Sequence, residues 1–177
     1  MAANAALYFH DEGFRTDRPK LMGRHAAGEG FLKGFLAHAE IEELVAYVDS
    51  EAQLQAFAAL CTALGGRNAA LPRHAAGPGR EEPLARVGTL LLPGPGLAEQ
   101  AWRRPRGDPR RWAITGVTHT TASDRAMDSV GELLTGPVEP WDALICTSRA
   151  VLATVERLFA AWADWLALRL GARHFPR

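Results

Sequence analysis

The chain lacks an excess of charge of either sign, a framework of cysteines and any long apolar run, and each absence excludes a class of protein. Its 177 residues include 20 Lys+Arg and 20 Asp+Glu, so it carries no basic footprint for nucleic acid. The two cysteines, Cys61 and Cys146, lie far apart, and we expect buried free thiols in a reducing cytoplasm. No window reaches the roughly 18 apolar residues of a membrane span. The N-terminal "MAANAALYFHDEGF" lacks the basic n-region of a signal peptide.

Apolar runs of strand length alternate along the chain with amphipathic runs of helix length. Strands separated by helices need crossover connections, which give a parallel sheet. The run 143–146 is apolar at every position, as in a strand covered on both faces, whereas 68–83 has the composition of an irregular surface loop. We therefore predict a single Rossmann-like α/β domain over 1–177, with an open, doubly wound, mainly parallel sheet of about five strands and helices on both faces. The expected strands are 6–10, 44–48, 87–94, 112–119 and 141–148.

Serines precede three of the expected helices, where a hydroxyl can accept from the free N–H groups of the first turn. Ser50 is followed three residues later by Gln53, which completes a capping box. Ser123 and Ser148 are expected to cap the helices that follow them. For the last helix we expect an inward stripe formed by Val151, Val155, Leu158, Phe159, Trp162, Trp165 and Leu166.

The stretch "MGRHAAGEGFL" has glycines five residues apart, at Gly23 and Gly28, as in a Walker A loop. That loop continues with Lys and Ser/Thr, but here Glu29 and Gly30 follow, and a carboxylate would repel a triphosphate. The G-x-G-x-x-G pattern of a nicotinamide site is also missing. Two interpretations stay open. Either the N–H groups of the first helical turn, near 27–30, receive an anion, or the glycines only permit close backbone packing.

His119 ends an expected strand at the edge where ligands of such sheets collect. Hydroxyls surround it in the sequence, at Thr118, Thr120, Thr121 and Ser123. A neutral imidazole there can exchange hydrogen bonds with a sugar or alcohol hydroxyl, although a core histidine bonded to a backbone carbonyl is an equal alternative. The chain contains no G-x-S-x-G nucleophile turn. No two histidines have metal-ligand spacing; they are His10, His25, His38, His74, His119 and His174.

Two further segments admit two interpretations each. The loop "RRPRGDPRR" (103–111) carries five arginines and one Asp, and it is either a solvated loop or a binder of phosphate, an anionic acceptor or an acidic lipid surface. The segment "LFAAWADWLALRL" (158–170) suits a core or domain-interface helix better than interfacial membrane attachment.

Three blocks in order carry a resemblance to a known family: "KLMGRHAAGEGFLKGFL", "WAITGVTHTTAS" and "EPWDALICTSRAVLATVERL". Together they resemble the N-terminal domain of bacterial GT-B-fold, retaining, nucleotide-sugar-dependent glycosyltransferases (the group 1 type). The resemblance implies that Gly23, Arg24 and Gly28 approach the donor phosphates and sugar. It also implies that His119 is the catalytic residue, beside the donor sugar, with Thr118, Thr120 and Ser123 on the acceptor side.

The same resemblance implies a two-domain enzyme of which this chain is the N-terminal, acceptor-side half. The family's donor half, with paired glutamates and a basic phosphate clamp, has no counterpart in these residues, so we expect the chain alone to have little or no transferase activity. The implied partners are a nucleotide-sugar donor, a carbohydrate, lipid or small-molecule acceptor, the missing C-terminal domain, and a second copy through the exposed cleft face. Neither a cofactor nor a metal is expected. The implied location is the cytoplasm, including the surface of the inner membrane.

Two alternatives to the transferase remain. One is a non-catalytic α/β binding or interaction module, which should be polar outside any pocket. The other is a flavodoxin-like nucleotide or flavin binder, which is disfavoured because Asp11 and Glu12 stand where a phosphate loop would need hydroxyls.

Overall fold

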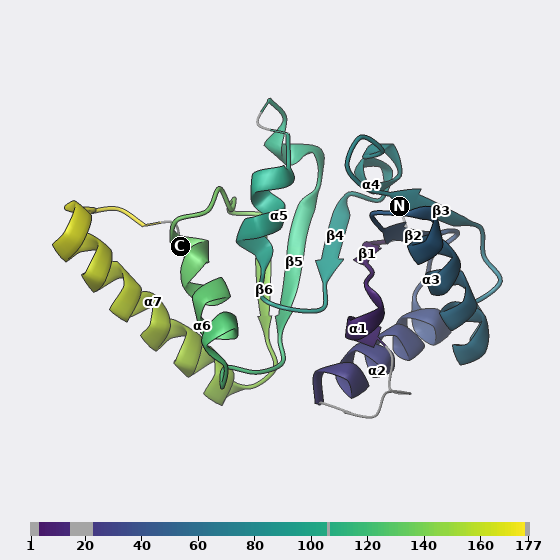
Figure 1. Cartoon of the computed structure of the whole chain (residues 1–177), viewed down its shortest axis with the longest axis horizontal. Helices are drawn as coiled ribbons and strands as arrows, with labels where there is room; N and C mark the ends of the chain where they lie inside the picture. Colours follow the sequence, from purple (N-terminus) through teal and green to yellow (C-terminus); the bar gives the residue numbers. More distant parts are fainter. Residues whose placement is uncertain (1–3, 15–22, 106, 176–177) are drawn as a thin grey trace. The chain divides into compact units, whose positions relative to one another are not determined.

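The computed structural model describes residues 4–14, 23–105 and 107–175, and it divides into two compact units, Met1–Pro93 and Gly94–Arg177 (Figure 1). We describe each unit by itself. The prediction of one domain over the whole chain stays a prediction.

The first unit contains a four-stranded parallel sheet in the order β3-β2-β1-β4. The chain runs from β1 outward to β2 and β3, then crosses back to place β4 on the other side of β1 (Figure 1). This reversal defines a doubly wound fold. The elements are β1 (Ala6–Tyr8), α1 (Asp11–Phe14), α2 (Gly23–His38), β2 (Leu44–Tyr47), α3 (Glu51–Leu64), β3 (Arg73–Ala76), α4 (Glu82–Val87) and β4 (Thr89–Leu92).

The core of the first unit lies on both sides of β2, whose four residues are all buried. Phe9 packs edge-on against Phe57 of α3 and stacks on Phe14 of α1. Leu32 and Leu36 of α2 are fully buried in the same cluster, as their helical spacing predicts. The strand is thus covered on both faces, the environment that its continuous apolar sequence favours.

The second unit contains the parallel pair β5 and β6, with Thr115 beside Ala143 and Thr118 beside Cys146. Helix α6 follows β5 and helix α7 follows β6 in the sequence, and α6 packs beside α7 (Figure 1). The elements are α5 (Leu97–Arg103), the 3-10 turn η1 (Pro109–Arg111), β5 (Ala113–Thr118), α6 (Asp124–Gly131), the 3-10 turn η2 (Glu132–Leu134), β6 (Ala143–Cys146) and α7 (Arg149–Leu170). The α/β fold class with parallel strands is therefore confirmed.

The three serine caps predicted from the sequence are confirmed, but the capping box is not complete, because the Gln53 side chain accepts from the N–H of Asp49 and not from that of Ser50. The hydroxyls of Ser50, Ser123 and Ser148 each accept from a backbone N–H in the first turn of the helix that follows. Gly65 and Gly171 end α3 and α7 with positive φ of 69° and 67°, a conformation that favours glycine.

Three sequence predictions are wrong in detail. The expected loop 68–83 contains β3 and the start of α4, so the described strands number six and not five. Strand β6 is not covered on both faces, because Ala143 and Ile145 are exposed. Trp165 does not point inward, since 52% of it is exposed. The polar "RHAA" of β3 forms a strand because it pairs with β2, and that pairing lies outside any local sequence signal.

Candidate functional site

The candidate site residues fall into both units: Gly23, Arg24 and Gly28 in the first, and Thr118, His119, Thr120 and Ser123 in the second. In the second unit, β5 and β6 are parallel, so their carboxyl ends meet at one edge of the pair. The first turns of α6 and α7 open at this same edge, since each helix follows its strand after a short connection. Ligands of open α/β sheets bind at such edges.

His119 follows directly after β5 at this edge and is partly buried. Desolvation lowers the pKa of its imidazole below the usual 6.5, so the ring is neutral at pH 7. Among the described residues, its side chain forms no hydrogen bond or ion pair. A neutral imidazole can donate from one nitrogen and accept at the other, so this ring is suited to bind a hydroxyl-bearing ligand.

The hydroxyls near His119 have different roles. The Thr120 hydroxyl accepts from the N–H of Ala122 at 3.1 Å and closes a turn. The Ser123 hydroxyl accepts from the N–H of Ala126 at 3.3 Å and caps α6. Thr118 is fully buried, and its hydroxyl has no partner among the described residues. Two of the three predicted acceptor-side hydroxyls therefore each accept one hydrogen bond within the fold and keep their own O–H as a donor.

Sequence reasoning missed one contact that joins the two strands at this edge. The hydroxyl of Thr147, just after β6, donates to the main-chain carbonyl of Thr118 at 3.0 Å. This bond extends the β5–β6 pairing one residue beyond the last register pair, Thr118 and Cys146. It thereby fixes the backbone immediately before His119. The sequence places Thr147 beside the cap Ser148, but its partner depends on strand register.

In the first unit, Gly28 serves packing. A Cβ built on Gly28 would lie 2.0 Å from the carbonyl oxygen of Gly13, so α1 and α2 approach each other too closely for any side chain. Residues 27–30 lie inside α2 rather than in its first turn, because the helix begins at Gly23. The expectation of free N–H groups at 27–30 is therefore wrong: each of these lies at least four residues into the helix, where N–H groups bond to the preceding turn.

Gly23 and Arg24 occupy the first turn of α2. Gly23 is exposed, and a Cβ there would meet nothing within 4 Å. The side chain of Arg24 lies outside the described residues. Of the three residues predicted to approach the donor phosphates, Gly28 is packed against α1 and the Arg24 side chain is not described. Gly23 therefore has space around it that a ligand could occupy.

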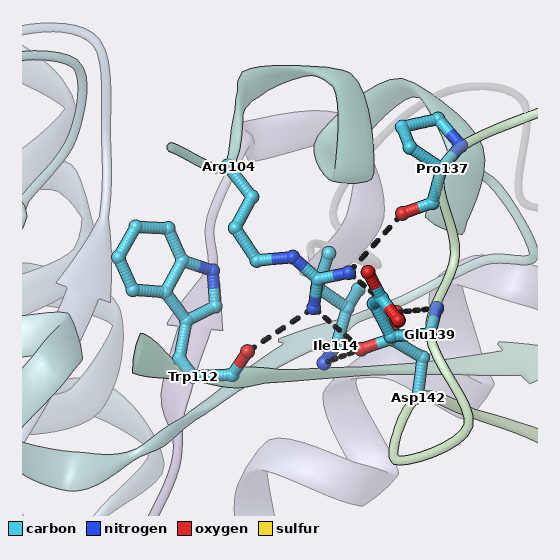
Figure 2. Close-up of polar contacts among 6 residues, drawn as sticks. All are labelled: Arg104, Trp112, Ile114, Pro137, Glu139 and Asp142. Atoms are coloured by element: carbon cyan, nitrogen blue, oxygen red, sulfur yellow. Dashed lines mark hydrogen bonds and ion pairs between the residues drawn. The ribbon is translucent and has the colours of Figure 1, made fainter. Parts of the chain in front are cut away.

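The most deeply buried charges of the second unit lie elsewhere, in an ion pair between Arg104 and Asp142 (Figure 2). Each side chain is only 2% exposed, and the guanidinium meets the carboxylate through two bonds of 2.8 Å. The carboxylate also accepts from the N–H groups of Ile114 and Glu139, both at 2.8 Å. Four donors thus satisfy one buried carboxylate, which is the condition for a buried charge to be tolerated.

The guanidinium of Arg104 donates further to the carbonyls of Trp112 and Pro137, both at 3.2 Å (Figure 2). Asp142 and Trp112 immediately precede β6 and β5, so the ion pair lies at the amino ends of these strands, opposite to the ligand edge. The pair joins the end of α5 to both strand entrances, and its role is structural. For Arg104, both sequence interpretations of the basic loop, solvated or anion-binding, are wrong.

Two other arginines of this loop, Arg103 and Arg110, also have partners, whereas Arg106 lies outside the described residues. Arg103 pairs with Glu99 one helical turn away at 2.7 Å. The guanidinium of Arg110 lies over the Trp141 ring, 5.3 Å from its centre. Within the described ranges, no group of three or more His, Cys, Asp or Glu side chains could hold a metal ion.

No family model, curated protein or solved structure matches the chain. None of the helices that the structure describes is long and apolar enough to cross a membrane.

Proposed function

We propose that the chain is the acceptor-side half of a GT-B-type, retaining glycosyltransferase that uses a nucleotide-sugar donor. One observation carries the proposal: a neutral, partly buried imidazole without a partner among the described residues, His119, stands at the carboxyl edge of parallel strands. The parallel α/β fold and the three sequence blocks quoted above support it. In this proposal His119 contacts the transferred sugar, and the acceptor approaches along the connections that follow β5 and β6.

In sugar transfer, the main task of the acceptor-side half is to orient the transferred sugar and the acceptor. A retaining transfer passes through an oxocarbenium-like state, and a neutral imidazole can hold a sugar hydroxyl in place without adding positive charge beside it. The departing diphosphate would be held mainly by a second domain. We propose a metal-independent, cofactor-free reaction in bacterial carbohydrate biosynthesis, located in the cytoplasm.

The test compares the longest protein that the reading frame encodes with the chain 1–177, using a panel of uridine, guanosine and adenosine diphosphate sugars. We expect sugar transfer by the longer protein and little or none by the chain alone. His119→Ala in the longer protein should lower kcat/KM by about tenfold, the size of one lost hydrogen bond. The matched control is His174→Ala, at an exposed histidine of the same unit, which should leave kcat/KM unchanged.

Two results would refute the proposal. Turnover of a nucleotide sugar by residues 1–177 alone would contradict the need for a second half. Saturable ligand binding by the longer protein without any turnover would favour the non-catalytic binding module.

A further inference from the structure

Strand β6 has the sequence of a buried strand but is not covered. The four residues of β6 include no charged residue, no glycine and no proline, and the same is true of β2. All four residues of β2 are buried, whereas none of the four residues of β6 is, and Ile145 is 46% exposed. Because strands of this composition are typically covered on both faces, β6 presents apolar surface that the described residues do not bury.

Strand β6 also has a free edge. It pairs with β5 on one side, and no strand that the structure describes pairs with its other side. An edge strand presents unpaired N–H and C=O groups with which another chain can pair, and proteins block such edges with charged side chains, proline or a bulge. The edge strand β3 of the first unit carries Arg73 and His74. In contrast, β6 carries no charge, and its four register pairs with β5 follow one another without a bulge.

We propose that β6 pairs antiparallel with β6 of a second copy of this chain, so that the two β5–β6 pairs form one continuous sheet. A two-fold axis perpendicular to the sheet makes the two edge strands antiparallel and keeps the same face of both copies on one side. Residues opposite each other across the axis then share a face, so Ile145 meets Ala143 or Ile145 of the second copy. This contact would cover the two exposed side chains of β6.

The charged residues on either side of β6 are complementary in this arrangement. Glu139 lies in the turn before β6, and Arg149 is the first residue of α7 after it. Neither side chain forms an ion pair among the described residues. In an antiparallel pair the start of each strand lies beside the end of the other, so Glu139 of each copy approaches Arg149 of the other. The edge is therefore complementary to itself, which favours a second copy over an unrelated strand.

Two further charges near β6 balance each other. Burial and the negative charge of Glu156 raise the pKa of the Cys146 thiol, so this carboxylate lies near the strand. The guanidinium of Arg110 lies over the ring of Trp141, just before the strand. With the complementary pair above, each copy brings two positive and two negative charges to this region, so net charge does not keep two copies apart.

The expected dimer is weak because the paired segment is short. A strand of four residues is about 13 Å long, whereas a standard protein interface buries about 800 Å² on each partner. We therefore expect an equilibrium between monomer and dimer. The contact uses the lateral edge of β6 and not the cleft face at the carboxyl ends of the strands, and the proposal is independent of the proposed sugar transfer.

Sedimentation velocity of the chain 1–177 over a range of concentrations tests the proposal, and we expect a dimer whose share rises with concentration. Ile145→Lys places a charge on the free edge and should raise the dissociation constant of the dimer by about tenfold or more. The matched control is Leu168→Lys, at an 84% exposed leucine near the end of α7. This control should dimerise like the wild type.

Charge reversal tests the antiparallel orientation. Arg149→Glu or Glu139→Arg alone sets like charges against each other in both symmetry-related contacts, and each should raise the dissociation constant by about tenfold. The double reversal should restore the wild-type dissociation constant to within about threefold. Since the two residues of one copy stand at opposite ends of β6, such a rescue requires a contact between copies.

Four results would overturn the proposal. The chain could stay monomeric at every concentration, or its dimer could keep the same dissociation constant in Ile145→Lys. A dimer that Leu168→Lys abolishes would place the contact on α7 instead, and a double reversal that fails to restore dimerisation would exclude the antiparallel pair. Circular dichroism and urea unfolding of each variant check that its fold matches the wild type, as expected because none of the substituted residues is buried.

Discussion

Removing the charge of Asp142 should destabilise the second unit more than any surface substitution, because it leaves the Arg104 guanidinium buried without a counterion. Breaking a buried ion pair by removing one partner costs about 3–5 kcal/mol. The destabilisation caused by removing the Asp142 charge should lie in the upper part of this range. The reason is that its carboxylate accepts four hydrogen bonds, two from Arg104 and two from backbone N–H groups. In Asp142→Asn, one carboxylate oxygen becomes an amide that faces these donors and cannot accept from them.

The assay is urea unfolding followed by tryptophan fluorescence, because Trp112 supplies a carbonyl to the same network. With a slope of about 2 kcal/mol per M, the loss should lower the urea midpoint by about 2 M. The matched control is Arg103→Met, which removes the exposed ion pair between Arg103 and Glu99, one helical turn apart. This substitution should lower the free energy of unfolding by under about 0.5 kcal/mol. A loss below about 1 kcal/mol in Asp142→Asn would refute the account of this network as a structural clamp.

Three other substitutions test separate parts of the structure. Gly28→Ala places a Cβ against the Gly13 carbonyl and should lower the free energy of urea unfolding by about 1–3 kcal/mol. The control Gly23→Ala should change it by no more than about 0.5 kcal/mol. Equal effects of the two substitutions would argue against the close α1–α2 approach. Since burial lowers the folded-state pKa of His119, the unfolded chain takes up the proton first as the pH falls. The wild type should then lose stability relative to His119→Gln below about pH 6.5, and a constant difference between pH 8 and pH 5 would contradict the desolvated imidazole. Ser148→Ala removes the cap of α7 and should cost about 1 kcal/mol by thermal or urea unfolding; an unchanged free energy of unfolding would contradict the role of this cap.

The features predicted correctly from sequence depend on residues close together in the chain. The caps at Ser50, Ser123 and Ser148 need only a few neighbouring residues. The strand–helix alternation that predicts a parallel fold is likewise a local pattern repeated along the chain.

The features that the sequence did not predict depend on distant partners. Strand β3 has a polar sequence and forms only by pairing with β2, and β6 is exposed despite its apolar residues because burial depends on what covers a strand. Nothing local distinguishes Arg104 from its neighbours in "RRPRGDPRR", since its role depends on Asp142, 38 residues later. The packing role of Gly28 similarly depends on the position of Gly13 in another helix.

We propose that the carboxyl edge of β5 and β6 receives a sugar through His119. Titration of the ¹⁵N-labelled chain with nucleotide sugars and simple glycosides, followed by amide chemical shifts, tests this proposal. We expect saturable shifts clustered at residues 118–123 and 147–149, absent in His119→Ala and retained in His174→Ala. Shifts that cluster elsewhere, or that persist unchanged in His119→Ala, would contradict it.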